Sequence, residues 1–377
     1  MAFHTYMCEG IDTAIIECGI GGEYDSTNML VQPTVTGITS LGIDHTHLLG
    51  DSIESISWHK AGIMKKDVPC FSAPQPESAT NVLWQRAVEK GTTLQITLPD
   101  PKLDSIKLGL SAPFQRTNAS LAIAIAKAHL HALGHTSPES LPQPFIRGLE
   151  TVQLSGRCEV RHDKHVSLTW HIDSAHTVES LTLSAQWFAS QLPVLTSTPL
   201  KGKRILLFNQ QTRSPAPLLR AIYTTLTTSL PPGSLPFDHV VFTSNRTFAD
   251  SGFKADLRSL NNDDGKVESL EVQEGMRVIW TELDQFRRTD LQSSQRVALP
   301  SSQHSGPSNI EDAEKAAGAE VVIKGSIEDA VAWCRDIAST TERGDGENVM
   351  VLVTGSVHLV GGVLEVLETE MERNREV

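Results

Sequence analysis

The 377-residue sequence lacks an excess of positive charge, since 32 Lys and Arg stand against 45 Asp and Glu, a formal net charge of −13. This argues against a nucleic-acid coat protein, which needs clustered positive charge to bind phosphates. The sequence also lacks an apolar run of about 20 residues, the length of a membrane span. Its first residues, MAFHTYMCEGID, have neither the charged nor the apolar region of a secretory signal. We therefore expect a cytoplasmic protein with no nucleic-acid or membrane partner.

Paired cysteines are missing as well. The sequence has five cysteines without a C-x-x-C pair: Cys8, Cys18, Cys70, Cys158 and Cys334. This pattern argues against a zinc knuckle and against a disulfide framework, so we expect reduced, mostly buried thiols. The content of 39% hydrophobic and 20% charged residues is ordinary for a folded globular chain. A chain of this length more often forms two domains than one.

Short runs rich in Val, Ile and Leu alternate with longer segments of helical period. This alternation is typical of βαβ units and predicts an α/β fold with mostly parallel sheets. The expected strands are Thr13–Ile16, Val35–Ile43, Val166–Ile172, Arg204–Phe208, His239–Thr243, Val321–Ile323 and Val349–Thr354. Crossover connections bring the residues that follow such strands to one edge of the sheet, where these folds bind ligands. We expect the chemistry at that edge.

Two features divide the chain. A helical region ending near Leu149 passes through QLSGR into a new series of strands, which predicts one domain over 1–150 and a second over 151–377. Residues 286–318 form a polar tract rich in Ser, Gln and Pro. Because such a tract buries little surface, we expect a long surface insertion there.

The first half of the chain contains a set of residues suited to phosphate chemistry. Glu17 ends an apolar run and precedes CGIGGEYDSTN, and Asp44-His45 ends the next predicted strand. A carboxylate at a strand end facing a glycine-rich turn is a common way to hold Mg²⁺ beside phosphates. The glycines are explained equally well by a tight structural turn. Asp44-His45 is explained equally well by helix capping or packing.

Lys60 lies on the apolar stripe of a predicted helix, since Ile53, Ile56 and Lys60 fall at i, i+3 and i+7. One interpretation is that its butyl stem packs while its ammonium group reaches water. The other is that Lys60 is held near Glu17 and His45, either paired with a phosphate or converted to a carbamate by CO₂. The periodicity alone favours the first.

Several longer segments follow one another along the chain: IIECGIGGEYDSTN, TGITSLGIDHTHLLGDSIESISWHKAGIMK, VPCFSAPQPE, LGLSAPFQRTNASLAIAIAKAHL, GLETVQLSGRCEV, IDSAHTVES, ILLFNQQTR and VLVTGSVHLVGGVLEVLE. In this order they resemble the folylpolyglutamate synthases of the Mur ligase superfamily, particularly the fungal ones. The resemblance covers nearly the whole chain apart from the polar tract, and separate motifs in register are more specific than one glycine-rich loop. It implies a partial central ATPase-type domain followed by a Rossmann-like C-terminal ligase domain.

The resemblance implies an activity. Enzymes of this family use ATP to phosphorylate the γ-carboxylate of a folate, and the amine of glutamate attacks the acyl phosphate. Mg²⁺ is needed to offset the charge that gathers during the transfer. By the matching positions, Glu17 and His45 are implied metal ligands, and Lys60 is the implied carbamylated lysine that supports a second metal and the γ-phosphate.

The resemblance also implies binding residues for the nucleotide and the amino acid. The residues matched to the adenosine-contacting segment are Gln115 and Asn118. Arg157, Asp173 and His176 match the family residues that close over the nucleotide. The resemblance also implies a catalytic role for Arg157 and His176, together with Lys60. The residues matched to the segment near the incoming glutamate are Ser356 and His358.

One family motif does not occur in the 377 residues: the phosphate-binding P-loop, G-x-x-x-x-G-K-[ST]. KGK at Lys201–Lys203 precedes a predicted strand, and DGKV at Asp264–Val267 has no following Ser or Thr. The backbone cradle and lysine of that loop anchor the β- and γ-phosphates, so ATP binding by this chain is in doubt. Ser174 stands where the family has a glycine, and its β-carbon obstructs conformations that glycine permits.

Three hypotheses therefore stay open. The first is a folylpolyglutamate synthase-like ligase whose N-terminal P-loop segment is missing from this sequence. The second is a truncated paralogue with ATP-independent, metal-assisted hydrolysis or acyl transfer on a carboxylated small molecule. The third is a non-catalytic partner that pairs with a full-length synthase, or with itself, through the truncated face. The family implies a cytoplasmic location, with a mitochondrial form as the other option.

Overall fold

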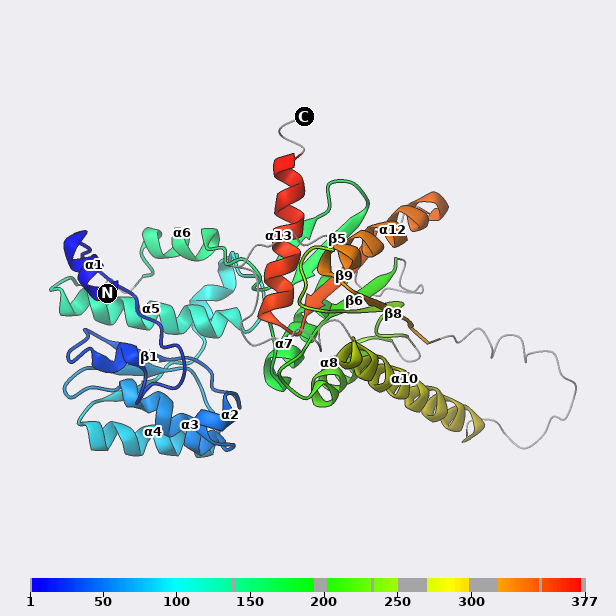
Figure 1. Cartoon of the computed structure of the whole chain (residues 1–377). Helices are drawn as coiled ribbons and strands as arrows, with labels where there is room; N and C mark the ends of the chain where they lie inside the picture. Colours follow the sequence, from blue (N-terminus) through cyan, green and yellow to red (C-terminus); the bar gives the residue numbers. More distant parts are fainter. Residues whose placement is uncertain are drawn as a thin grey trace, which may run out of the picture. The chain divides into compact units, whose positions relative to one another are not determined.

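The computed structural model describes residues 2–136, 140–192, 202–231, 234–249, 270–297, 318–345 and 348–373. The chain separates into two compact units, Met1–Val152 (unit 1) and Gln153–Val377 (unit 2) (Figure 1). This division lies two residues after the boundary predicted between residues 150 and 151. Each unit contains a mostly or wholly parallel sheet with helices, so the predicted α/β class is confirmed.

Unit 1 is built on a three-stranded parallel sheet in the order β1-β2-β3. The strands are β1 (Thr36–Ile38), β2 (Cys70–Ser72) and β3 (Leu94–Ile96). The helices are α1 (Ala2–Cys8), α2 (Thr46–Leu49), α3 (Ile53–Lys60), α4 (Glu77–Lys90), α5 (Gln115–Ala132) and α6 (Gln143–Thr151), with short turns η1 (Ser26–Met29), η2 (Ala61–Ile63) and η3 (Pro101–Ser105). Ile38, Met64 and Leu83 form a core that ties the sheet to η2 and α4.

The first two predicted strands of unit 1 differ from the structure. The strand predicted over Thr13–Ile16 is wrong, because these residues have no regular structure and Ile15 is 97% exposed. The strand predicted over Val35–Ile43 is shortened to β1. Apolar composition favours a strand only where a neighbouring strand pairs with it. Within the described sheet of unit 1, no strand pairs with residues 13–16.

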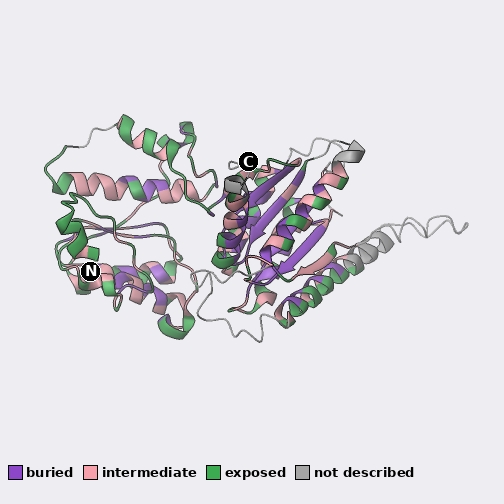
Figure 2. Ribbon diagram, turned by 45° about the horizontal axis from the view of Figure 1, so that its top comes forward, coloured by how far each residue is buried: buried purple, intermediate pink, exposed green. Residues whose placement is uncertain are grey.

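Unit 2 contains a six-stranded sheet in the order β4-β5-β9-β6-β7-β8, in which β4 is antiparallel to β5 and the other neighbours are parallel. The strands are β4 (Glu159–His162), β5 (Leu168–Ile172), β6 (Arg204–Phe208), β7 (His239–Thr243), β8 (Glu320–Lys324) and β9 (Val349–Thr354). Every residue of β5, β6 and β7 is buried, as the purple strands of Figure 2 show. Parallel strands that are covered on both faces of the sheet are buried along their whole length in this way.

The helices of unit 2 are α7 (Val178–Gln191), α8 (Pro215–Ser229), α10 (Glu271–Val297), α12 (Ile327–Asp345) and α13 (Val357–Arg373). Helix α8 packs against both α7 and α10, and α12 packs against α13. The apolar core between strands and helices includes Trp170, Ile205, Val351 and Leu359.

The surface insertion predicted over residues 286–318 begins within helix α10, and its being an insertion stays a prediction. Residues 286–297 continue helix α10. Their sequence, FRRTDLQSSQRV, has no Gly or Pro, and a polar composition does not prevent a helix from continuing. Residues 298–317 lie outside the described residues.

The cysteines are free, and Cys70, Cys158 and Cys334 are buried, while Cys18 is partly buried and Cys8 exposed. Among the helices that the structure describes, none combines the length and the apolar character needed to cross a membrane.

Candidate active site

The carboxylate of Asp25 holds the glycine-rich loop that follows Glu17 in one conformation through hydrogen bonds. Its Oδ2 accepts hydrogen bonds from the backbone N–H groups of Gly19, at 2.9 Å, and Ile20, at 3.1 Å. Its Oδ1 accepts one from the N–H of Thr27, at 2.9 Å, and one from the Thr27 hydroxyl, at 2.6 Å. These bonds, with that of the Thr27 hydroxyl foremost, lower the pKa of the Asp25 carboxyl. The carboxylate is thus engaged in holding the loop.

Two glycines let this loop lie directly on the end of α3. A β-carbon at Gly22 would lie 2.7 Å from the carbonyl oxygen of His59 and 3.0 Å from that of Lys60. A β-carbon at Gly62 would overlap the backbone of Glu23. Close approach of backbone to backbone therefore requires these glycines, which supports the structural interpretation of the motif. The same approach brings the loop beside the backbone of Lys60.

The three residues expected at the metal site come from different elements. Glu17 is exposed in the irregular segment before the loop, and Lys60 is the partly buried last residue of α3. His45 precedes α2 in the left-handed conformation, with φ of 51°, and its side chain is 36% exposed with Nε2 3.7 Å from Asp44 Oδ2. Within the described residues, no hydrogen bond or ion pair joins Glu17, His45 and Lys60 to one another.

The side chains available to a metal ion in the described residues are few. No group of three or more His, Cys, Asp and Glu side chains gathers to hold a metal in the part of the chain that the structure describes. A Mg²⁺ ion beside a nucleotide needs fewer protein ligands, because phosphate oxygens and water complete its coordination. The exposed carboxylate of Glu17 fits that role. The ring of His45 is partly exposed, so it is also accessible to such an ion.

Gln115 and Asn118 lie together on the first turn of α5. The Nδ2 of Asn118 donates to the Oε1 of Gln115 at 2.9 Å, and both residues are partly buried. Residues three apart in a helix share a face, which explains this contact; their proposed contact with adenosine stays a prediction.

In unit 2, Asp173 follows β5 and organises the turn before β4. Its Oδ2 accepts the N–H of Cys158 at 2.9 Å and the Cys158 thiol at 3.2 Å, and its Oδ1 accepts the N–H of Ala175 at 3.0 Å. Burial first, and then the charge of Asp173, raise the pKa of the Cys158 thiol. Cys158 therefore stays protonated and acts as a donor, in a left-handed conformation with φ of 46°.

Ser174 joins Arg157 and His176. The guanidinium group of Arg157 donates to the Ser174 hydroxyl, and the carbonyl of Ser174 bonds the Nδ1 of His176 at 2.9 Å. The structure thus brings the predicted residues Arg157, Asp173 and His176 together. Ser174 is not among the residues with positive φ, so its backbone does not require the glycine of the family.

The segment after β9 carries the remaining predicted residues. The hydroxyl of Ser356, which is 9% exposed, accepts the N–H of His358 at 3.2 Å at the start of α13, and His358 is exposed. Gly355 has φ of +105°, and a β-carbon there would overlap the ring of Phe208.

Buried amide side chains, to which the sequence alone assigned no role, lie at the same edge of the sheet. Asn209, which follows β6, is 0% exposed; its Nδ2 donates to Asn245 Oδ1 at 2.6 Å. Gln273 of α10 donates to Asn209 Oδ1 at 3.3 Å. Gln210 donates to the carbonyl of Gly355 at 2.9 Å, which ties the ends of β6 and β9. The polar run NQQ directly after an apolar strand was the available signal.

No protein-family model matches the chain. The chain is similar to the folylpolyglutamate synthase of Neurospora crassa, with 40% identity over 372 residues that cover 98% of this chain and 63% of the relative. It is 37% identical to the folylpolyglutamate synthase of Candida albicans over 386 residues, which cover 99% of this chain and 67% of the relative. The chain therefore spans roughly two thirds of the length of these relatives.

Solved structures share the fold. The Mycobacterium tuberculosis folylpolyglutamate synthase complexed with ADP and AMPPCP matches with a TM-score of 0.63 and 21% identity, covering 97% of this chain and 71% of that one. The folylpolyglutamate synthase of Thermotoga maritima matches with a TM-score of 0.52 and 18% identity, covering 98% of this chain and 68% of that one.

Proposed function

Because the chain belongs to the folylpolyglutamate synthase family, we propose that it takes part in the ATP-dependent addition of glutamate to the γ-carboxylate of a folate. The observation that carries this proposal is the 40% identity to the Neurospora crassa enzyme across 98% of this chain. A carboxylate is a poor electrophile until it carries a phosphate leaving group, so the reaction runs through an acyl phosphate that the amine of glutamate attacks.

In unit 2, Arg157 is suited to a nucleotide phosphate or to the acyl phosphate. Its side chain is exposed while its guanidinium group is anchored on Ser174. The remaining N–H donors of such a fork bind phosphate oxygens in a fixed geometry. We assign Asp173 to shaping the adjoining turn, and His176, fixed by its bond to the Ser174 carbonyl, to the same anionic ligand. Ser356 and His358 are assigned to the incoming glutamate.

In unit 1, Glu17 and His45 are the proposed ligands of Mg²⁺, which would offset negative charge on the transferred phosphoryl group. Lys60 is proposed to carry a carbamate, and Gln115 and Asn118 are proposed to contact adenosine. The partial burial of Lys60 at the end of α3 supports a role beyond a solvent-directed amine. Folate, glutamate and ATP are all water-soluble substrates, and we propose a cytoplasmic or mitochondrial location for the reaction.

The test is a product assay on the purified chain with tetrahydrofolate, glutamate, Mg²⁺ and bicarbonate, with and without ATP, followed by mass spectrometry. We expect glutamate addition that depends on ATP, with the phosphates held by groups other than a P-loop, and that is lost in Lys60→Ala and Arg157→Ala variants that remain folded. A folded chain that binds Mg²⁺ but adds no glutamate would contradict the proposal. Co-purification with a full-length synthase would instead support the non-catalytic partner hypothesis.

A further inference from the structure

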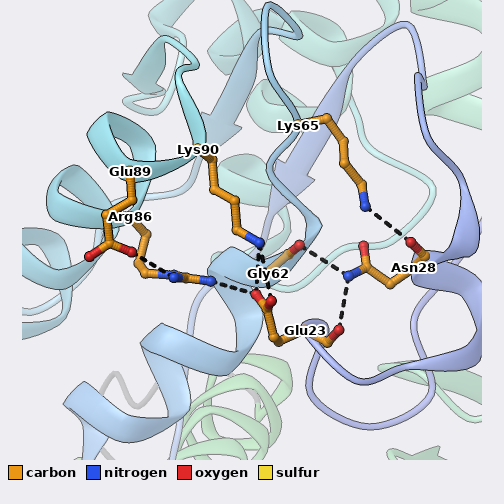
Figure 3. Close-up of polar contacts among 7 residues, drawn as sticks. All are labelled: Glu23, Asn28, Gly62, Lys65, Arg86, Glu89 and Lys90. Carbon is orange, nitrogen blue, oxygen red and sulfur yellow. Dashed lines mark hydrogen bonds and ion pairs between the residues drawn. The ribbon is translucent and has the colours of Figure 1, made fainter.

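Glu23, in the glycine-rich loop of unit 1, lies between two cations of α4 (Figure 3). Its carboxylate pairs with the guanidinium group of Arg86 and lies 3.0 Å from the Nζ of Lys90. The side chain of Arg86 is 8% exposed and that of Glu23 is 21% exposed. Water screens such an ion pair less than a surface pair. Loss of one partner leaves the other partly buried with weaker compensation, from Lys90 for Glu23 and from Glu89 for Arg86.

Arg86 also reaches α3. Its guanidinium carbon lies 4.4 Å from the centre of the Trp58 ring, a cation–π contact, and its NH1 lies 2.6 Å from the carboxylate of Glu89. One side chain therefore connects α4, the loop and α3. Glu89 is different from Glu23 because it is on the same helix as Arg86 and its side chain is 56% exposed.

The backbone of Glu23 continues the connection to the end of α3. Its N–H donates to the carbonyl of His59 at 2.8 Å, one residue before Lys60. The Nδ2 of Asn28 bridges the carbonyls of Glu23, at 3.0 Å, and Gly62, at 3.2 Å. The Nζ of Lys65 in turn donates to the carbonyl of Asn28 at 3.0 Å (Figure 3). Lys60 thus lies between two points at which its helix end is bonded to the loop.

We propose that Arg86 and Lys90 are positioning residues that act through Glu23: they fix the loop on the end of α3 and thereby set the position of Lys60. The inference rests on the proposed function, in which Lys60 belongs to the reaction site. A displacement of about 1 Å in a reacting group can cost about a hundredfold in rate, so a clamp at this point controls turnover.

The perturbations are Glu23→Gln and Arg86→Met, which remove one partner of the pair at similar size. Glu89→Gln is the matched control, because it removes another carboxylate from Arg86 without touching the loop. The double variant Glu23→Gln with Arg86→Met completes a double-mutant cycle with the two single variants. It tests whether the pairing, rather than either side chain alone, is what matters.

Two readouts are independent of turnover. In bicarbonate-free buffer, a short acetic anhydride pulse followed by mass spectrometry measures the acylation rate of the Lys60 amine. Hydrogen exchange measures opening of residues 19–28. We expect the Lys60 acylation rate to change by at least about threefold, and loop exchange to accelerate about tenfold, in Glu23→Gln and Arg86→Met. Glu89→Gln should match the unmodified chain, and the double variant should change both values by less than the sum of the two single changes.

Turnover gives the third readout. In the single variants we expect kcat to fall while the KM values for folate and glutamate stay within about twofold, since positioning of Lys60 rather than substrate binding is affected. Unchanged Lys60 acylation in both variants would overturn the inference. So would exchange that rises equally in β1, β2 and β3, because that indicates general destabilisation of unit 1. If the unmodified chain adds no glutamate, the proposed function fails, and the acylation and exchange results still decide the clamp.

Discussion

Replacement of Gly355 by alanine tests how tightly the edge of the unit 2 sheet is built. Gly355 joins the end of β9 to Ser356 with φ of +105°, a conformation that residues with a β-carbon rarely adopt. The added methyl group would overlap the ring of Phe208 and lie 2.8 Å from the carbonyl oxygen of Asn209. Both neighbours are 0% exposed, so neither can move into open space.

The magnitude follows from two costs. Holding alanine in this region of φ costs about 1–3 kcal/mol, and forcing a methyl group into a packed core costs about 1–3 kcal/mol more. We therefore expect Gly355→Ala to lower the free energy of unfolding of unit 2 by about 2–6 kcal/mol. Gly361→Ala is the control: it lies inside α13 with no atom within 4 Å of the added carbon. It should be neutral or stabilise by up to about 1 kcal/mol.

The assay must read unit 2 separately, because a chain with two units does not unfold as a single two-state system. Urea titration followed by hydrogen-exchange mass spectrometry of peptides from β5, β6 and β9 meets this need. A Gly355→Ala protein that unfolds at the same urea concentration as Gly361→Ala would refute the reasoning about this turn.

Three further predictions concern single groups. Burial lowers the pKa of His171 from 6.5 to about 4. Between these pH values the unfolded state binds more protons, so the free energy of unfolding of unit 2 falls as the pH drops from 6.5 to 4. His171→Phe should remove up to about 3 kcal/mol of that pH dependence, measured by urea titration at pH 4 and pH 7. Ser174→Ala should leave the fold intact but raise the KM for ATP several-fold, because Arg157 loses its anchor; an unchanged KM would contradict that role. Glu17→Gln and His45→Asn should abolish Mg²⁺-dependent activity while changing the free energy of unfolding by less than about 0.5 kcal/mol. Asparagine is chosen at position 45 because it tolerates the left-handed φ found there. Unfolding in either variant would indicate a structural role.

The sequence predicted the buried strands of unit 2 well. Strands β6, β7 and β9 have the predicted bounds, because a strand covered on both faces is an unbroken apolar run. The segment Thr13–Ile16 has the same composition but forms no strand. Its conformation depends on pairing, which composition does not report. Strands β2 and β3, of three residues each, are too short to give a periodic signal.

In the candidate site, too, some contacts were indicated by the sequence and others were not. The family resemblance, rather than any pattern in the residues themselves, grouped Arg157, Asp173 and His176, and in the structure Ser174 and Cys158 connect them. The contact between Glu23 and Arg86 joins residues 63 apart in sequence, and only the packing of α4 beside the loop creates it. The amide pair of Asn209 and Gln273 likewise depends on how α10 packs against β7 and β8. Contacts of this kind carry no periodicity that a single sequence reveals.

The most direct test of the proposed reaction follows oxygen. Folate labelled with ¹⁸O in its γ-carboxylate is incubated with the chain, ATP, Mg²⁺, bicarbonate and glutamate, and the released phosphate is examined by mass spectrometry. An acyl phosphate intermediate transfers one carboxylate oxygen to phosphate, so we predict ¹⁸O in the phosphate in step with glutamate addition. Glutamate addition without labelled phosphate, or a folded chain that forms no product, would contradict the account.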